Sequence, residues 1–336
     1  MTTTMRPSFA AWTRLLIATV VVSLSACSGT PPDAPKNARP LRPGYGTLEE
    51  LFQTEIVNIG LEELGYEVVP GSETEYDIIH EAIAKGFLDF TTAHWNYNHA
   101  DFLEQNGGDS NLVRAGTLIE DVLQGYVIDS ATAKKYNITS LEQLQDPEIA
   151  ALFDSDEDGK ANLVGCIVGW GCHDVTEHHL EAYGLKDTVE HDSSNYFGLI
   201  EGVIQAHQAQ KPVLYYTWTP FWLNFILVPG EDVEWLSVPY TDLPSAQGRD
   251  VPTVYEGKNL GFAINEMDIL ANKDFLEAHS KARKFFEVVT VPNEAVSLQN
   301  QKMREGENTP AQIRRHAEEW VIDNQSLFDS WVKAAR

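Results

Sequence analysis

Hydrophobic residues recur at helical spacing in several parts of the chain. One amphipathic helix is predicted over 48–64, followed by Gly65 where a helix commonly ends, and a second over 75–85, ending near Gly86. Another helix is expected to start at SLEQL, with Ser140 as its N-cap. The tail over 309–335 is also predicted to be helical, with a packing face of Ala317, Trp320, Val321, Leu327, Phe328 and Trp331.

Short apolar runs lie between these helices and predict β-strands. They are YEVVPG (66–71), FLDFTTAHW (87–95), GYVID (125–129), PVLYYTW (212–218) and LGFAINEMDILA (260–271). Helices that alternate with strands indicate an α/β fold. Because 336 residues exceed what one compact core usually organises, we expect two lobes.

The N-terminus has the order of an export signal. Arg6 and Arg14 precede an apolar run over 15–22 and then Leu-Ser-Ala-Cys ending at Cys27, which resembles the bacterial lipoprotein signal. We therefore expect a signal peptide over 1–26 and a lipid on Cys27, with simple cleavage after an A-x-A-like site as the alternative. The Pro-rich and polar stretch over 27–41 has the composition of a flexible tether.

Acidic residues dominate the composition. The chain has 50 Asp and Glu against 24 Lys and Arg, for a formal net charge of -26. Such a charge argues against nucleic acid or an anionic membrane surface as a partner. The remaining membrane link is the expected lipid.

Three cysteines are present, and lipidation of Cys27 leaves Cys166 and Cys172. In an exported, oxidising compartment this pair predicts a disulfide. Zinc is the competing use of a Cys pair, but no second pair exists and the nearby histidines lack a zinc-finger spacing. We expect His178 and His179 on a solvated helix face.

An acidic stretch copies the first half of a calcium loop. Asp154, Asp156 and Asp158 with Gly159 match positions 1, 3, 5 and 6, but position 12 falls on Gly165, where a bidentate Glu is needed. A solvated turn is therefore favoured over a calcium site, and no other metal or cofactor is predicted.

Tryptophans gather at the ends of predicted strands, where open α/β sheets bind ligands. TAHWNYNHAD holds Trp95 and His99, GCIVGWGCHD holds Trp170 between two glycines, and YYTWTPFW holds Trp218 and Trp222. Any one of them could serve core packing, but three together predict a cage for a quaternary ammonium ion, because indole faces attract cations that cannot donate hydrogen bonds. Three such contacts supply at most about 6 kcal/mol, whereas micromolar binding needs about 8 kcal/mol.

A second group on the ligand must supply the remaining binding free energy. Asp174 and Glu177 have capping-box spacing, which predicts a helix that starts close to Cys172. The backbone amides of Gly171 and Cys172 would then face an anion, and His99 could donate a further hydrogen bond. A cation cage beside an anion site describes a betaine.

At these residues the chain resembles the family of periplasmic glycine betaine and proline betaine binding proteins of bacterial osmoprotectant ABC importers, the ProX type. The resemblance covers essentially the whole mature region and is carried by FQTEIVNIGLEELGY, ITSLEQLQDPEIAALFDSDEDGKANLVGC, GWGC and KPVLYYTWTPFW. It implies an aromatic box of Trp95, Trp170 and Trp218, carboxylate contacts from His99, Gly171 and Cys172, and the Cys166 to Cys172 disulfide. The stretch 96–98 (Asn-Tyr-Asn) departs from the family pattern, so we expect a different bend there and an altered ligand choice.

The resemblance also implies a type II periplasmic-binding-protein fold, with ligand in the cleft between two hinged lobes. We expect one lobe from 42–122 and 245–336 and the other from 123–244. The implied partners are a betaine ligand, an ABC permease and its ATPase subunit, and the protein is expected to act as a monomer.

Two other classes of function compete with betaine binding. An enzyme is disfavoured because the chain lacks a G-x-S-x-G elbow, an HExxH motif and a P-loop. A binding protein for choline, carnitine or a carbohydrate remains the alternative, since stacked tryptophans also bind sugar rings.

Overall fold

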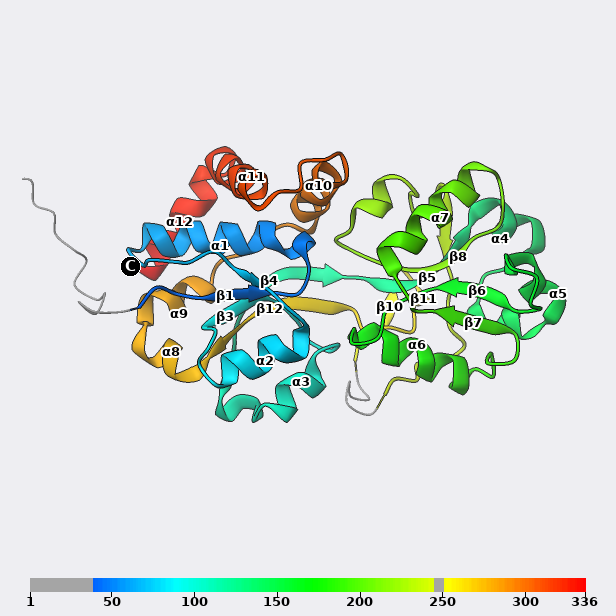
Figure 1. The fold of residues 1–336 in the computed structure, drawn as a ribbon, viewed down its shortest axis with the longest axis horizontal. Coiled ribbons are helices and arrows are strands. Elements are labelled where there is room, and N and C mark those ends of the chain that lie inside the picture. Colours follow the sequence, from blue (N-terminus) through cyan, green and yellow to red (C-terminus); the bar gives the residue numbers. More distant parts are fainter. Residues whose placement is uncertain (1–38, 245–250) are drawn as a thin grey trace, which may run out of the picture. The chain divides into compact units, whose positions relative to one another are not determined.

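The computed structural model describes residues 39–244 and 251–336, which contain two five-stranded sheets with helices packed on them (Figure 1). The expected signal peptide, Cys27 and most of the tether lie outside the described residues. The two sheets agree with the expected α/β class. Within the described ranges no helix is long and apolar enough to cross a bilayer.

The first sheet has the strand order β2-β1-β3-β12-β4. Its strands are β1 (Pro43–Tyr45), β2 (Ser72–Glu73), β3 (Phe90–Trp95), β4 (Leu112–Val122) and β12 (Asn265–Asn272). Strands β1, β2 and β3 run parallel, while β12 returns antiparallel between β3 and β4. The helices of this first lobe are α1 (Leu51–Glu63), α2 (Tyr76–Ala84), α3 (Ala100–Gln105), α8 (Lys273–Ala278), α9 (Ser280–Phe286), α10 (Asn293–Arg304), α11 (Pro310–Asp323) and α12 (Gln325–Ala335).

The second sheet has the order β7-β6-β8-β5-β9. Its strands are β5 (Gln124–Asp129), β6 (Ala161–Val164), β7 (Val189–Asp192), β8 (Leu214–Trp218) and β9 (Val233–Trp235). The helices of this second lobe are α4 (Ser130–Tyr136), α5 (Pro147–Ala150), α6 (Gly171–Ala182) and α7 (Tyr196–Gln208). Each sheet has its own core of buried hydrophobic residues.

Most of the predicted elements are present, and two of the predicted helices match closely. A 3-10 turn over Leu48–Glu50 continues into α1, and Gly65 ends the helix with a positive φ of 94°. Helix α2 fills most of 75–85 and is followed by Gly86, whose φ is 72°. The predicted strands over 87–95, 125–129, 212–218 and 260–271 overlap β3, β5, β8 and β12, respectively.

One local prediction was wrong. YEVVPG forms only an isolated bridge between Val68 and Leu41, because Pro70 interrupts any further ladder and pairing resumes at β2. A helix does start at SLEQL, as expected: it is a 3-10 helix (Leu141–Gln145) capped by Ser140. It ends there because Pro147 forces an extended conformation on the residue before it.

The tail differs from one continuous helix. Helix α11 ends at Asp323. The next residue, Asn324, has a φ of -111°, outside the helical region, and α12 starts a new helical phase after it. As a result Leu327 is 40% exposed and does not belong to the packing face, whereas Phe328 and Trp331 do.

The return to the first lobe occurs later than residue 245. Phe262 belongs to the core of the second sheet, and the amide of Val238 donates to the carbonyl of Asn259 over 2.8 Å. The stretch 251–262, with the short hairpin β10 (Val254–Tyr255) and β11 (Lys258–Asn259), therefore packs with the second lobe, and the chain rejoins the first sheet at β12.

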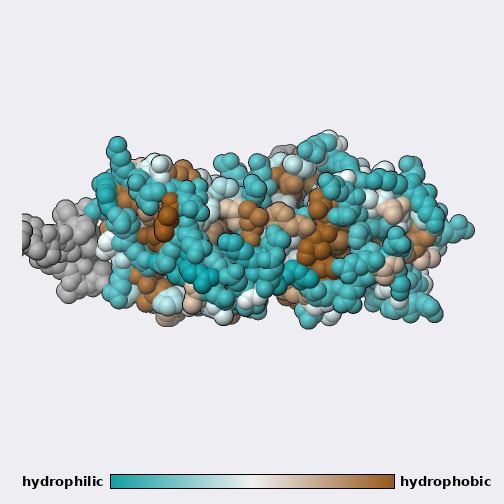
Figure 2. Space-filling view, turned by 90° about the horizontal axis from the view of Figure 1, so that it is seen from above, coloured by the Kyte–Doolittle hydropathy of each residue, from teal (hydrophilic) through white to brown (hydrophobic). Residues whose placement is uncertain are grey.

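The face shown in Figure 2 is largely hydrophilic, and its hydrophobic residues lie in several separate areas.

Candidate functional site

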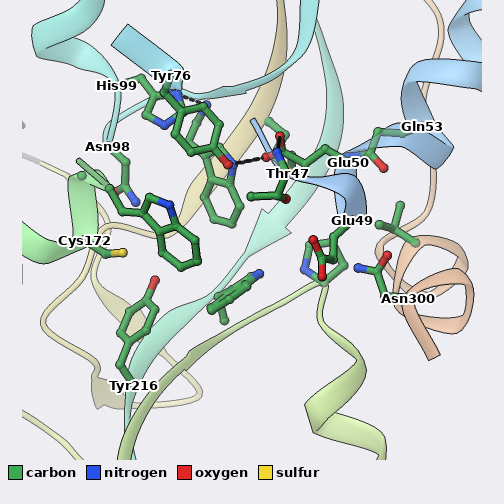
Figure 3. Close-up of a pocket in the computed structure, with 17 residues that line it drawn as sticks. Thr47, Glu49, Glu50, Gln53, Tyr76, Asn98, His99, Cys172, Tyr216 and Asn300 are labelled. Atoms are coloured by element: carbon green, nitrogen blue, oxygen red, sulfur yellow. Dashed lines mark hydrogen bonds between the residues drawn. The ribbon is translucent and has the colours of Figure 1, made fainter. Parts of the chain in front are cut away.

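A pocket lies where residues of both lobes meet, and it is open to solvent. The first lobe contributes Thr47, Glu49, Glu50, Gln53, Tyr76, Trp95, Asn98, His99, Met267, Val296 and Asn300, and the second Trp170, Gly171, Cys172, Tyr216, Trp218 and Pro220 (Figure 3).

All six residues predicted to bind the ligand line this one pocket. Trp95 is the last residue of β3 and Trp218 the last of β8, so both lie at carboxyl ends of strands. His99 caps α3, and Trp170 caps α6, whose first two residues are Gly171 and Cys172. The predicted residues thus lie together in one pocket, while their role in binding stays a prediction.

The three tryptophans of the pocket form a pair and a single ring: Trp170 contacts Trp218, and Trp95 lies apart from them in the chain of the first lobe. The rings of Trp170 and Trp218 are perpendicular, with centroids 5.7 Å apart, and Trp218 stacks on Phe221 at 4.1 Å. Trp95 packs against hydrophobic residues of both lobes. Trp222, from the same segment as Trp218, does not line the pocket. Its ring instead makes a cation–π contact with Arg304, whose Cζ lies 4.2 Å from the ring centroid.

Glu50 is a buried acid in the pocket wall that sequence reasoning missed. Its Oε1 accepts hydrogen bonds from the hydroxyl of Tyr76 (2.9 Å) and the indole Nε1 of Trp95 (3.2 Å), and its Oε2 accepts from the amides of Gly46 (2.8 Å) and Thr47 (3.3 Å). Burial raises the pKa of Glu50 to about 7, although these hydrogen bonds favour the charged form. The pocket therefore holds an acid whose charge responds to pH near neutrality.

The signal for Glu50 was present in the sequence as a capping box. Thr47 and Glu50 have the S/T-x-x-E spacing at the start of the first helix, and both hydrogen bonds of the box form. A capping role alone did not predict that the same carboxylate would reach Trp95, which is distant in sequence.

His99 has a defined tautomer. Its Nδ1 accepts the amide N–H of Trp95 at 3.2 Å, so in the neutral ring the proton resides on Nε2. Burial, with the neighbouring rings of His80 and His94, keeps the pKa of His99 well below its usual range. His99 is thus a neutral hydrogen-bond donor, as the predicted carboxylate contact requires.

The Gly-Trp-Gly sequence has a structural explanation. Gly169 has a φ of 95°, which turns the chain, and a Cβ on Gly171 would lie 2.3 Å from the carbonyl oxygen of Asn98. Cys166 and Cys172 form the predicted disulfide, with Cα atoms 5.9 Å apart. The loop that carries Trp170 is therefore closed covalently and packed against the loop after β3.

Two predictions about α6 were wrong in detail. The helix starts near Cys172 as expected, but Trp170 is its N-cap, so Asp174 and Glu177 fall inside the helix and form no capping box. His179 is fully buried, with Nδ1 2.9 Å from the hydroxyl of Tyr126, and so does not lie on a solvated face. The period of the helix turns this residue toward Phe262 of the later chain.

The acidic stretch forms a turn, as expected. Carboxylate oxygens of Asp154, Asp156 and Asp158 lie within 4.8 Å of one another. However, both oxygens of Asp154 accept amides of the same loop, from Glu157 at 2.7 Å and Gly159 at 2.9 Å. Calcium binding there stays untested.

Comparison with known proteins identifies the family. Residues 43–323 match the family model described as the substrate binding domain of ABC-type glycine betaine transport system (OpuAC). The chain belongs to this family. It is 42% identical over 305 residues to the glycine betaine-binding periplasmic protein OusX of Dickeya dadantii, covering 90% of this chain and 92% of that protein. It is 39% identical over 322 residues to the glycine betaine/proline betaine-binding periplasmic protein of Salmonella typhimurium, covering 96% and 97%.

A solved structure shares the fold. The glycine betaine, L-proline ABC transporter binding protein ProX from Borrelia burgdorferi superposes with a TM-score of 0.67 at 18% identity, covering 89% of this chain and all of that one. This OpuAC-family chain therefore has the expected two-lobed type II fold. Its family and relatives are substrate-binding proteins of ABC transporters, which confirms the expectation that it is not an enzyme. The relatives are periplasmic proteins.

Proposed function

We propose that this protein captures betaines of the glycine betaine and proline betaine type and delivers them to an ABC permease. One observation carries the proposal: Trp95, Trp170 and Trp218 line a single pocket together with a neutral histidine donor and the N-terminus of α6. The names of the relatives support the same ligand class.

The cationic end of the ligand would lie against the indole rings. Each cation–π contact contributes roughly 0.5 to 2 kcal/mol. The ionised form of Glu50, in the same wall, adds attraction for a cation that cannot donate a hydrogen bond. Glu50 is therefore part of the proposed cation site.

The carboxylate end would meet hydrogen-bond donors. The first amides of a helix have no partner within the helix, and Gly171 and Cys172 hold these positions in α6. His99 donates from Nε2, the nitrogen that its contact with Trp95 leaves protonated. Because the pocket offers indole rings for a cation and hydrogen-bond donors for a carboxylate, it disfavours choline, which has no carboxylate, and a sugar, which has no cation.

The delivery cycle follows from the two lobes. Ligand that contacts residues of both lobes favours their closure, here 42–122 with the chain after 262, and 123–244 with 251–262. We propose that the closed monomer docks on the permease, that a separate ATPase subunit drives release, and that a lipid on Cys27 holds the protein at a membrane face.

Isothermal titration of the mature protein tests the ligand. We expect micromolar or tighter binding of glycine betaine and proline betaine, weaker binding of carnitine and choline, and no heat with a disaccharide. Absence of heat from both betaines would refute the proposed substrate class. Mass spectrometry of the membrane fraction tests for acyl chains on Cys27.

A further inference from the structure

Three potential metal ligands lie together outside the pocket. His173 and Glu177 of α6 and His191 of β7 each offer one ligand atom, and these atoms all lie within 4.8 Å of one another. None of the three lines the pocket or belongs to the acidic turn.

The backbone places these side chains in a pattern that metals use. His173 and Glu177 are four residues apart on one helix and so share a face, as ligand pairs on helices do. The third ligand comes from a neighbouring strand, and its Nδ1 already lies 2.8 Å from Oε1 of Glu177. The rings of His173 and His191 are 5.4 Å apart, centroid to centroid.

The orientation of both rings is set by their surroundings. The side chain of His191 is only 2% exposed, and its Nε2 lies so close to Gly165 that a Cβ there would be 2.3 Å away. Nδ1 is therefore the nitrogen that faces Glu177. His173 has Nδ1 3.1 Å from Oδ1 of Asp174, the carboxylate–histidine contact that commonly orients a metal ligand and leaves Nε2 free.

We propose that His173, Glu177 and His191 form a binding site for a divalent transition metal of the zinc class. Two imidazole nitrogens and one carboxylate are a recurrent zinc set, and they leave a fourth position for water. Nitrogen donors disfavour calcium and magnesium, which take oxygen ligands.

The site has a defined place in the fold. The metal would join α6 to β7 at His173, which directly follows Cys172. The helix start that lines the pocket would then be held by the disulfide on one side and by the metal on the other. Bound metal should raise the melting temperature without being required for ligand binding.

Titration of the metal-free mature protein with Zn²⁺, followed by calorimetry, and with Co²⁺, followed by its visible absorption, tests this site. We expect one metal per chain and a Co²⁺ spectrum of low coordination number. His173→Gln and Glu177→Gln should each weaken Zn²⁺ binding at least tenfold, and both positions are partly exposed, so the fold tolerates the change. His178→Gln is the matched control, because His178 is on the same helix but contacts Asp242 at 2.8 Å.

Two outcomes would overturn the proposal: no Zn²⁺ binding below millimolar concentration, or binding that the two variants leave unchanged. An Asp156→Asn, Asp158→Asn variant checks that the metal is not held by the acidic turn. Glycine betaine titrated into the same samples reports the proposed function separately, so failure of one does not imply failure of the other.

Discussion

The indole Nε1 of Trp95 donates a 3.2 Å hydrogen bond to the buried carboxylate of Glu50, which is 45 residues earlier in the chain. This contact joins the start of the first helix to the end of β3 and places an acid beside the proposed cation cage. The charge of Glu50 is therefore expected to depend on whether the pocket holds a cation.

The Glu50 pair predicts that betaine affinity rises with pH. Burial raises the pKa of Glu50 to about 7, and a bound cation favours the ionised form. Affinity should therefore increase up to about tenfold between pH 6 and pH 8, which corresponds to about 1.4 kcal/mol of attraction between the cation and the carboxylate. Calorimetry in buffers of different ionisation heats should show proton release near pH 7, and Glu50→Gln should abolish both effects. A pH dependence that persists in this variant would point to another group, although His99 stays neutral over this range.

The same pKa predicts how stability depends on pH. Because the pKa of Glu50 is higher in the folded state than in the unfolded chain, its ionisation disfavours folding as pH rises from about 4.5 to 7. This difference in pKa corresponds to roughly 3 kcal/mol of unfolding free energy lost over that range. Chemical denaturation at pH 5 and pH 8 measures it. The free energy of unfolding of the wild type should exceed that of Glu50→Gln by less at pH 8 than at pH 5. An equal difference at both pH values would contradict the assigned pKa.

Trp170 provides a test of the cage. Trp170→Ala should weaken glycine betaine binding by about 1 to 2 kcal/mol from the lost cation–π contact, with a further loss of box shape. Trp170→Phe should retain part of the affinity. Trp320→Ala is a control, because this residue of α11 does not line the pocket. An unchanged dissociation constant for Trp170→Ala would assign this ring to packing.

Gly171 provides a test of the close contact between the loops. Gly171→Ala would bring Cβ within 2.3 Å of the carbonyl oxygen of Asn98, so one loop must move. We expect betaine affinity to fall at least tenfold, measured by calorimetry. Gly202→Ala on α7 is the matched control, since nothing lies within 4 Å of a Cβ there, and it should raise helix stability by about 0.5 to 1 kcal/mol. Equal betaine affinity of the two variants would show that the loop carrying Asn98 can move without changing the binding site.

The disulfide is expected to serve the pocket more than the fold. Its cysteines are six residues apart, so closing this short loop contributes only roughly 2 kcal/mol of stability. The double variant Cys166→Ser, Cys172→Ser should bind betaine markedly more weakly, whereas its melting temperature should fall only slightly. A lower melting temperature with an unchanged dissociation constant would make the bridge purely structural.

The sequence by itself determined the local features of this protein. Helical periodicity located α1 and α2, apolar runs located β3, β5, β8 and β12, and tryptophans at strand ends located the pocket. These features follow from short-range rules that a window of residues contains. The pairing of Cys166 with Cys172 also followed, because the expected lipid left only these two thiols.

Only the tertiary structure decided which distant side chains meet. It brought Glu50 to Trp95, buried His179 against Tyr126, and set His191 beside Glu177. None of these contacts follows from residue type or local spacing, because each depends on how separate elements pack. Burial then changed the chemistry of the groups, raising the pKa of Glu50 by removing water from its carboxylate.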